Sequence, residues 1–258
     1  MKKLPMLLQG LLLCLVACTA PVAAGERLRV GYFSLPPHVL ENGSVSNSPA
    51  MAYLNRVLDK TGLQADYQNY PLSRLLNLLR DNQIDAALIL ARNDDRARYL
   101  DYPETPFLST QPAFAVSAGK PISTLEQLRS TRPLVIGIWQ GGYRSPTLDS
   151  LDASLIPIAG DDIAPRGLRM LSMGRIDAFF SPDIHSIRSV VRKTGLGEHI
   201  VVIPVPDEKT SLYTVFSSEA GKRYKRRYQE ALSAMRREMP YEKFLLQLLS
   251  EPPPPPQN

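Results

Sequence analysis

The first candidate for chemistry is Arg96, which follows Asn93, Asp94 and Asp95 just after an apolar segment. The planar guanidinium of an arginine donates two parallel, charge-assisted hydrogen bonds to a carboxylate. An arginine in this place is therefore a candidate clamp for a small acid. The residue types alone also allow a surface arginine that pairs with Asp94 or Asp101.

The second candidate is the turn 140–145, which contains Gly142 and Tyr143 and ends at Ser145, the expected start of a helix. Glycine lets backbone N–H groups approach a ligand closely, and a helix N-terminus attracts anions. Trp139 precedes the turn at the carboxyl end of an expected strand, where open α/β sheets bind ligands. An ordinary strand-to-helix turn and a core tryptophan are the alternatives.

The sequence contains no recognisable catalytic constellation. His38, His185 and His199 lack metal-ligand spacing, and no nucleophile elbow, phosphate-binding loop or zinc motif is present. Asp85 and Asp177 each follow an isoleucine at the start of an expected strand, which favours a structural role. We therefore expect no catalytic residue, no metal and no cofactor.

The first 24 residues have the composition of an export signal. Lys2 and Lys3 precede an apolar run over 4–17, and Ala24 offers a small residue for cleavage before Gly25. The run is shorter than the ~20 apolar residues that a membrane span needs. The sequence thus predicts a signal peptide at 1–24 and a mature chain in the periplasm.

Cys18 offers a second way to process this leader. The preceding Leu15, Val16 and Ala17 resemble the lipobox of bacterial lipoproteins, in which the cysteine is lipidated. The mature protein is therefore expected to be either soluble or lipid-anchored. Cys14 also lies in the leader, so the mature domain has no disulfide, which suits an exported chain without unpaired thiols.

Charge gives little information about partners. Loss of the two leader lysines lowers the formal net charge from +5 to +3. Basic residues concentrate in 222–227 and at Arg236 and Arg237, on one face of an expected helix, which predicts a solvated face or a docking surface for a partner or anionic lipid. No aromatic-rich module accompanies them, so no nucleic-acid partner is expected.

Strands and helices alternate along the mature chain, which predicts an α/β fold of mainly parallel sheets flanked by helices. Ser48 and Pro49 have the pattern of a helix start, and Ser123 with Glu126 has capping-box spacing. Two segments, around 76–86 and 168–178, repeat a helix end, a turn and an Ile-Asp-Ala strand start. The repeat indicates two lobes of the same build. The expected strands lie at 28–33, 64–70, 84–90, 134–139, 155–158, 176–180 and 212–217.

The domain prediction follows from this repeat. The first lobe takes 26–112, the second takes 118–211, and helices over 218–250 return to the first. Two adjacent crossings make a hinge, and a hinge between two lobes makes a cleft. The expected hinge strands are 113–117 and 212–217, and the proline-rich residues 251–258 form a disordered tail.

Several short motifs, in their order and spacing, resemble the family 3 bacterial extracellular solute-binding proteins, the amino-acid-binding partners of ABC transporters. The resemblance covers nearly all of the mature chain and implies a two-lobe periplasmic binding protein fold of type II, acting as a monomer. The motifs are Val30-Gly31-Tyr32 with Pro36-Pro37, Ile84-Asp85-Ala86, Asp94-Asp95-Arg96, Asp101-Tyr102-Pro103 with Pro106-Phe107, Ile136-Gly137 with Gln140-Gly141-Gly142, and Gly174-Arg175-Ile176-Asp177-Ala178.

The resemblance also implies roles. Arg96 matches the family's arginine that clamps the ligand carboxylate, and the turn with Gly142 matches the second-lobe half of the site. Tyr32 belongs to the first motif and joins the candidate contacts. Arg74 lies in a stretch similar to divergent members, where it is either a second anion contact or an exposed helix arginine.

Two departures from the family pattern bear on the ligand. His38 occupies the place of an aromatic residue after Pro36-Pro37. The acid that binds the α-amino group is expected near Ser181, yet the matching position is Pro182, with Asp183 displaced by one. The resemblance thus implies a binding site for a small, carboxylate-bearing, amino-acid-like solute in which the amino-group contact is uncertain.

The expected function is capture of this solute by hinge closure and delivery to an inner-membrane ABC permease. Two alternatives remain. One is a receptor that presents the solute to a membrane sensor, and the other is an enzyme of the cyclohexadienyl dehydratase-like branch on the same fold.

Overall fold

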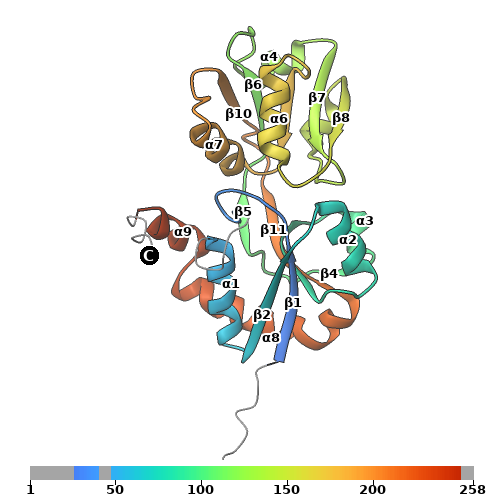
Figure 1. The fold of residues 1–258 in the computed structure, drawn as a ribbon, viewed down its shortest axis with the longest axis vertical. Helices are drawn as coiled ribbons and strands as arrows, with labels where there is room; N and C mark the ends of the chain where they lie inside the picture. The colour runs from blue at the N-terminus through green and yellow to red at the C-terminus, as the bar shows by residue number, and fades with distance from the viewer. Residues whose placement is uncertain (1–25, 41–47, 251–258) are drawn as a thin grey trace, which may run out of the picture.

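The computed structural model describes residues 26–40 and 48–250, with side chains up to residue 248. Two lobes, each built on one sheet, are stacked along the long axis of the molecule (Figure 1). The predicted two-lobe α/β architecture is confirmed. The predicted signal peptide 1–24, the lipidation candidate Cys18 and the tail 251–258 lie outside the described residues.

The first lobe carries a sheet of order β2-β1-β3-β11-β4, with β5 paired to β11. Strand β1 is parallel to β2 and β3, whereas β11 is antiparallel to β3, β4 and β5. The lobe consists of β1 Glu26–Tyr32, α1 Pro49–Asp59, β2 Leu63–Asn69, α2 Leu72–Arg80, β3 Ala86–Ala91, α3 Asp94–Ala97, β4 Leu100–Asp101, β5 Leu108–Thr110, β11 Thr210–Ser217, α8 Ser218–Glu238 and α9 Tyr241–Ser250.

The second lobe carries a sheet of order β10-β6-β9-β7-β8. Strands β7, β8 and β9 are parallel, and the strands that enter and leave the lobe, β6 and β10, add antiparallel pairs. The lobe consists of β6 Ala113–Ser117, α4 Leu125–Ser130, β7 Leu134–Trp139, α5 Pro146–Ser150, β8 Ala153–Ile158, α6 Ile163–Ser172, β9 Ala178–Ser181, α7 Ile184–Lys193 and β10 Ile200–Pro204.

The repeated Ile-Asp-Ala segments have the same structural role in both lobes. Asp85 Oδ2 accepts the backbone N–H of Arg29 at 2.8 Å, and Asp177 Oδ2 accepts that of Val135 at 2.8 Å. Each carboxylate thereby ties the start of one parallel strand to its neighbour. This arrangement supports the structural interpretation of both acids.

Side-chain caps fix several helix starts. Ser145 Oγ accepts the N–H of Leu148 at 3.2 Å, with proline at the first helical position. The capping box of α4 is displaced by one residue from the prediction, because Thr124 rather than Ser123 is the cap and Gln127 returns the hydrogen bond. A glutamine fills this reciprocal role as well as a glutamate.

The passages between the lobes differ from the predicted hinge strands. Residues 113–117 form β6 between β9 and β10, and residues 212–217 belong to β11 between β3 and β4. The chain crosses instead at 111–112 and 205–209, beside the antiparallel pair Thr110 and Thr210 (Figure 1). The prediction was wrong because the apolar segments 113–117 and 212–217 are buried as strands within the sheets. The crossings themselves are short and need no apolar segment.

Strand β3 contains a bulge at the edge of the space between the lobes. Two residues of β3, Leu88 and Ile89, oppose one residue of β11, Thr214, between the pairs Ala87–Val215 and Leu90–Tyr213. Within it Ile89 has φ +58°, a left-handed conformation that a β-branched residue rarely adopts. The bulge thus holds local backbone strain next to the cleft.

Buried apolar side chains form one large cluster that runs from the first lobe into the second and a smaller one on the other face of the second sheet. Within residues 26–40 and 48–250, no helix is both long and apolar enough to cross a bilayer. The larger cluster thus continues across the junction between the lobes, and the smaller one stabilises the second lobe.

Candidate functional site

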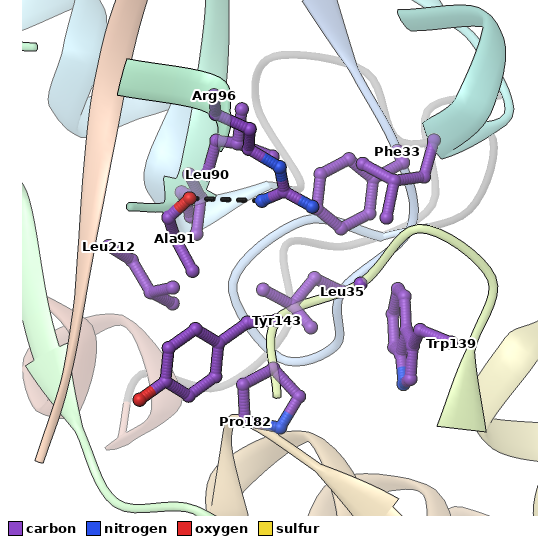
Figure 2. Close-up of a pocket in the computed structure, with 12 residues that line it drawn as sticks. Phe33, Leu35, Leu90, Ala91, Arg96, Trp139, Tyr143, Pro182 and Leu212 are labelled. Carbon is purple, nitrogen blue, oxygen red and sulfur yellow. Dashed lines mark hydrogen bonds between the residues drawn. The ribbon is translucent and has the colours of Figure 1, made fainter. Parts of the chain in front are cut away.

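A cavity lies between the lobes, at the carboxyl ends of β1, β3 and β7 (Figure 2). Its free volume is about 30 Å³, room for about two water molecules. Most of the described lining is apolar. It consists of Phe33, Leu35, Leu72, Ile89, Leu90, Ala91, Arg96, Trp139, Gly142, Tyr143, Pro182 and Leu212.

Arg96 supplies the positive charge of this cavity. Asn93 caps α3 by accepting the N–H of Arg96 at 2.9 Å, which turns the side chain back toward the end of β3. Its Nη1 donates to Ala91 O at 2.9 Å, and its Nη2 donates to Gly141 O of the other lobe. Arg96 is 3% exposed.

No carboxylate of the described residues lies within ion-pair distance of Arg96, and its neighbours Asp94 and Asp95 are not turned toward it. Burial lowers the pKa of Arg96 from its ordinary value, yet a guanidinium stays charged in proteins. A buried cation without a carboxylate partner is a strong site for an anion. The surface ion pairs allowed by the sequence are not formed.

The turn after β7 brings the second lobe to Arg96. Gly141 has φ +67°, a conformation that suits glycine, and it presents its carbonyl to the guanidinium. A Cβ on Gly142 would lie 2.6 Å from Trp139 Cβ, so only glycine fits there without a shift. Both glycines are therefore required by the shape of the site.

Trp139 forms one wall with Phe33, whose ring meets the indole edge-on with centroids 5.7 Å apart. The indole Nε1 is buried and has no hydrogen-bond partner among the described residues. The pKa of Tyr143 is raised, mainly by burial and to a lesser extent by the carboxylates of Glu208 and Asp149, so its hydroxyl stays protonated. The cavity therefore has one cation, Arg96, and aromatic walls that include Trp139 and Tyr143.

Figure 2 shows how these side chains converge. Arg96 enters from the first lobe, and Tyr143 and Pro182 enter from the second, with Leu35 between them. The site thus consists of two half-sites on separate bodies. Neither half alone encloses the space.

His38 and Asp183 lie outside this lining and contact each other. His38 Nε2 is 3.2 Å from Asp183 Oδ2, and the side chains are 2% and 0% exposed. Asp183 Oδ1 accepts from Thr110 Oγ1 at 2.5 Å, and Tyr241 OH lies 2.8 Å from His38 Nδ1. The carboxylate of Asp183 thus accepts from Thr110 and faces the ring of His38.

The electrostatics of this cluster follow from its neighbours. Burial by itself would raise the pKa of Asp183, but the facing His38, the hydrogen bond from Thr110 and the nearby His185 together lower it. Asp183 also caps α7 by accepting the N–H groups of His185 and Ser186. The cluster joins the first lobe, the hinge and the second lobe.

The other sequence candidates lie apart from the cavity. Ser145 is fully buried as the cap of α5, and Tyr32 ends β1 with 8% exposure. Arg74 is exposed on α2, with its guanidinium 5.7 Å from the ring of Tyr70. Of the predicted set, Arg96, Trp139, Gly142 and Tyr143 line the cavity, whereas His38 and Asp183 contact each other outside it.

Sequence reasoning missed the apolar lining. Phe33 and Leu35 follow β1 directly, and Ile89 and Leu90 end β3, so their place at strand ends was a usable signal. Leu212 comes from β11, which no local pattern links to the site. No group of three or more His, Cys, Asp or Glu side chains suited to a metal occurs among the described residues.

Neither a protein-family model nor a curated protein sequence matches the chain. Solved structures are similar over nearly its whole described length. An ancestral arginine-binding protein bound to arginine has a TM-score of 0.70 at 16% identity and covers 87% of this chain and 98% of its own. The GluR0 ligand-binding core from Nostoc punctiforme in complex with L-glutamate has a TM-score of 0.71 at 15% identity and covers 87% and 100%.

A histidine kinase sensor domain with similarity to periplasmic binding proteins is also similar, with a TM-score of 0.68 at 18% identity, covering 89% of this chain and 99% of that one. At these identities the similarity shows the fold alone. The chain has the two-lobe fold of periplasmic binding proteins, as the motif resemblance implied.

Proposed function

We propose that this chain is an extracytoplasmic solute-binding protein that closes its two lobes on a small carboxylate-bearing solute. The observation that carries the proposal is Arg96, buried at the cavity between the lobes with a backbone carbonyl of the opposite lobe as its cross-lobe acceptor. A carboxylate can replace Gly141 O on the guanidinium and accept two charge-assisted hydrogen bonds. The fold it shares with amino-acid-binding proteins supports this function.

Hinge closure is the proposed mechanism. The solute docks on Arg96 and Phe33 of the first lobe, and closure adds Trp139, Gly142 and Tyr143 from the second. Only the interactions that the solute makes in the closed form and lacks in the open form bias the protein toward closure. The closed surface is then what a membrane partner reads.

Delivery to an inner-membrane ABC permease is the first proposed outcome of closure. A sensory role is the second, supported by the similarity to a histidine kinase sensor domain. Uptake of labelled solute by cells with and without the gene separates the two. Loss of uptake in the deletion strain supports transport, and intact uptake with a lost transcriptional response supports sensing.

The binding proposal is tested by calorimetry of the mature chain against small carboxylates found by a thermal-shift screen. Arg96→Met should weaken binding about 100-fold, the loss of two charge-assisted hydrogen bonds. It should still fold, because replacing a buried unpaired charge by an apolar group is seldom destabilising. Arg98→Met, at the exposed arginine that follows α3, is the matched control, and equal binding by both variants would refute the site.

A further inference from the structure

We propose that the solute is a monocarboxylate with an apolar body and no ammonium group, a class that differs from an ordinary α-amino acid. This inference rests on the proposed function and deepens it. It comes from the charges that face the cavity, from the apolar walls and from the contacts of the nearest acids.

The charges of the described lining are one-sided. Arg96 is the one cation of that lining, and no aspartate or glutamate contributes to it. The carboxylate of a bound solute would neutralise the guanidinium. An additional ammonium would then be buried without an anionic partner, which is strongly unfavourable in a site that closes away from water.

Asp183, the acid nearest to the expected amino-group position, is occupied elsewhere. Its two oxygens accept from Thr110 and from the N–H groups of His185 and Ser186, and His38 faces it at 3.2 Å. It is 0% exposed, while its neighbour Pro182 lines the cavity in its place. Asp183 can therefore not accept from a solute without breaking the cluster that joins the lobes.

Two further acids influence Tyr143 but do not line the cavity. Asp149 accepts from Arg144 Nε at 2.6 Å. Glu208 accepts the N–H of Thr147 through Oε1 at 2.7 Å, and its Oε2 is buried without a hydrogen-bond partner among the described residues. Ala91 O is shared by Arg96 and Tyr102 OH. An ammonium in the cavity would therefore have no carboxylate of the described lining to pair with.

The walls describe the rest of the solute. Phe33, Leu35, Leu72 and Leu212 offer apolar contact, which suits an aliphatic or aromatic body. The indole of Trp139 adds an aromatic wall. A 2-oxo acid or an unsubstituted acid with an apolar chain meets these conditions.

Calorimetry on the full mature chain tests this with matched pairs. The pairs are 4-methyl-2-oxopentanoate with L-leucine and 3-phenylpropionate with L-phenylalanine. Each pair shares its body and carboxylate and differs mainly at the amino group. We expect the acid without the amino group to bind at least tenfold more tightly in at least one pair.

The outcomes separate this inference from the proposed function. Tighter or equal binding of both amino acids overturns the inference, and if Arg96→Met abolishes that binding, the proposed function stands. Failure of all four compounds to bind also overturns the inference. A thermal-shift screen of other small carboxylates that is also negative overturns the proposed function with it.

Discussion

His38 Nε2 lies 3.2 Å from Asp183 Oδ2, in a buried pair that joins the first lobe to the second beside the hinge. These are two of the positions at which the sequence departs from the pattern it resembles. The two departures are coupled, because His38 contacts the carboxylate of Asp183, which lies one residue after the position of the acid in the family pattern. The pair changes both how the lobes are joined and what the cavity can bind.

Asp183→Asn should destabilise the protein by about 3 kcal/mol at pH 7, because it removes a buried carboxylate that accepts from Thr110 and from two helix N–H groups. The lowered pKa of Asp183 means that its contribution is present above its ordinary pKa of 3.8 and is lost as the pH falls through the lower folded value. The difference in free energy of unfolding between wild type and variant should therefore decrease below about pH 4. Urea denaturation at a series of pH values measures it.

The control for this prediction is Asp152→Asn, which removes a pair with Arg132 in which the aspartate side chain is 70% exposed. Such surface pairs contribute about 0–1 kcal/mol. The account would be contradicted if the loss of unfolding free energy in Asp183→Asn stayed the same from neutral pH to the most acidic point. Such a result would mean that the charge of Asp183 does not stabilise the protein.

Gly142→Ala should weaken solute binding and lower stability by about 1–3 kcal/mol, the usual range for overpacking. The added methyl would lie 2.6 Å from Trp139 Cβ and 3.0 Å from Trp139 O, so the turn or the indole must move. Gly197→Ala is the matched control, because nothing lies within 4 Å of its Cβ. Equal binding and equal melting temperatures for the two variants would show that the turn is not constrained by shape.

Ile89→Gly should destabilise the protein less than Ile136→Gly, by about 1–2 kcal/mol, the strain that glycine relieves at a left-handed φ. Both isoleucines are buried in strands, at 1% and 0% exposure, so both lose similar apolar contact. Of the two, Ile89 has the left-handed φ. Chemical denaturation of both variants measures the difference, and a larger loss at position 89 would argue against strain in the bulge.

Local patterns predicted the elements and the repeat of the two lobes well. The strand at 134–139 has the predicted bounds, because a buried apolar run specifies it locally. The hinge was predicted at the wrong residues, because an apolar segment such as 113–117 does not show whether it crosses between the lobes or pairs within one sheet. Sheet partners decide that, and they lie far apart in the sequence.

The site could be predicted only in part for the same reason. Arg96 and Gly142 stand in local motifs, and both line the cavity. The pairing of His38 with Asp183 depends on how the two lobes meet, which no local spacing encodes. Leu212 reaches the cavity from β11, and its role likewise required the fold.

The central claim is that two half-sites close around one solute, and small-angle scattering of the mature chain tests it most directly. With a carboxylate of verified affinity at saturation, the radius of gyration should fall below that of the free protein, and Arg96→Met at the same solute concentration should show no such fall. A wild-type profile that is identical with and without the bound solute would contradict the account.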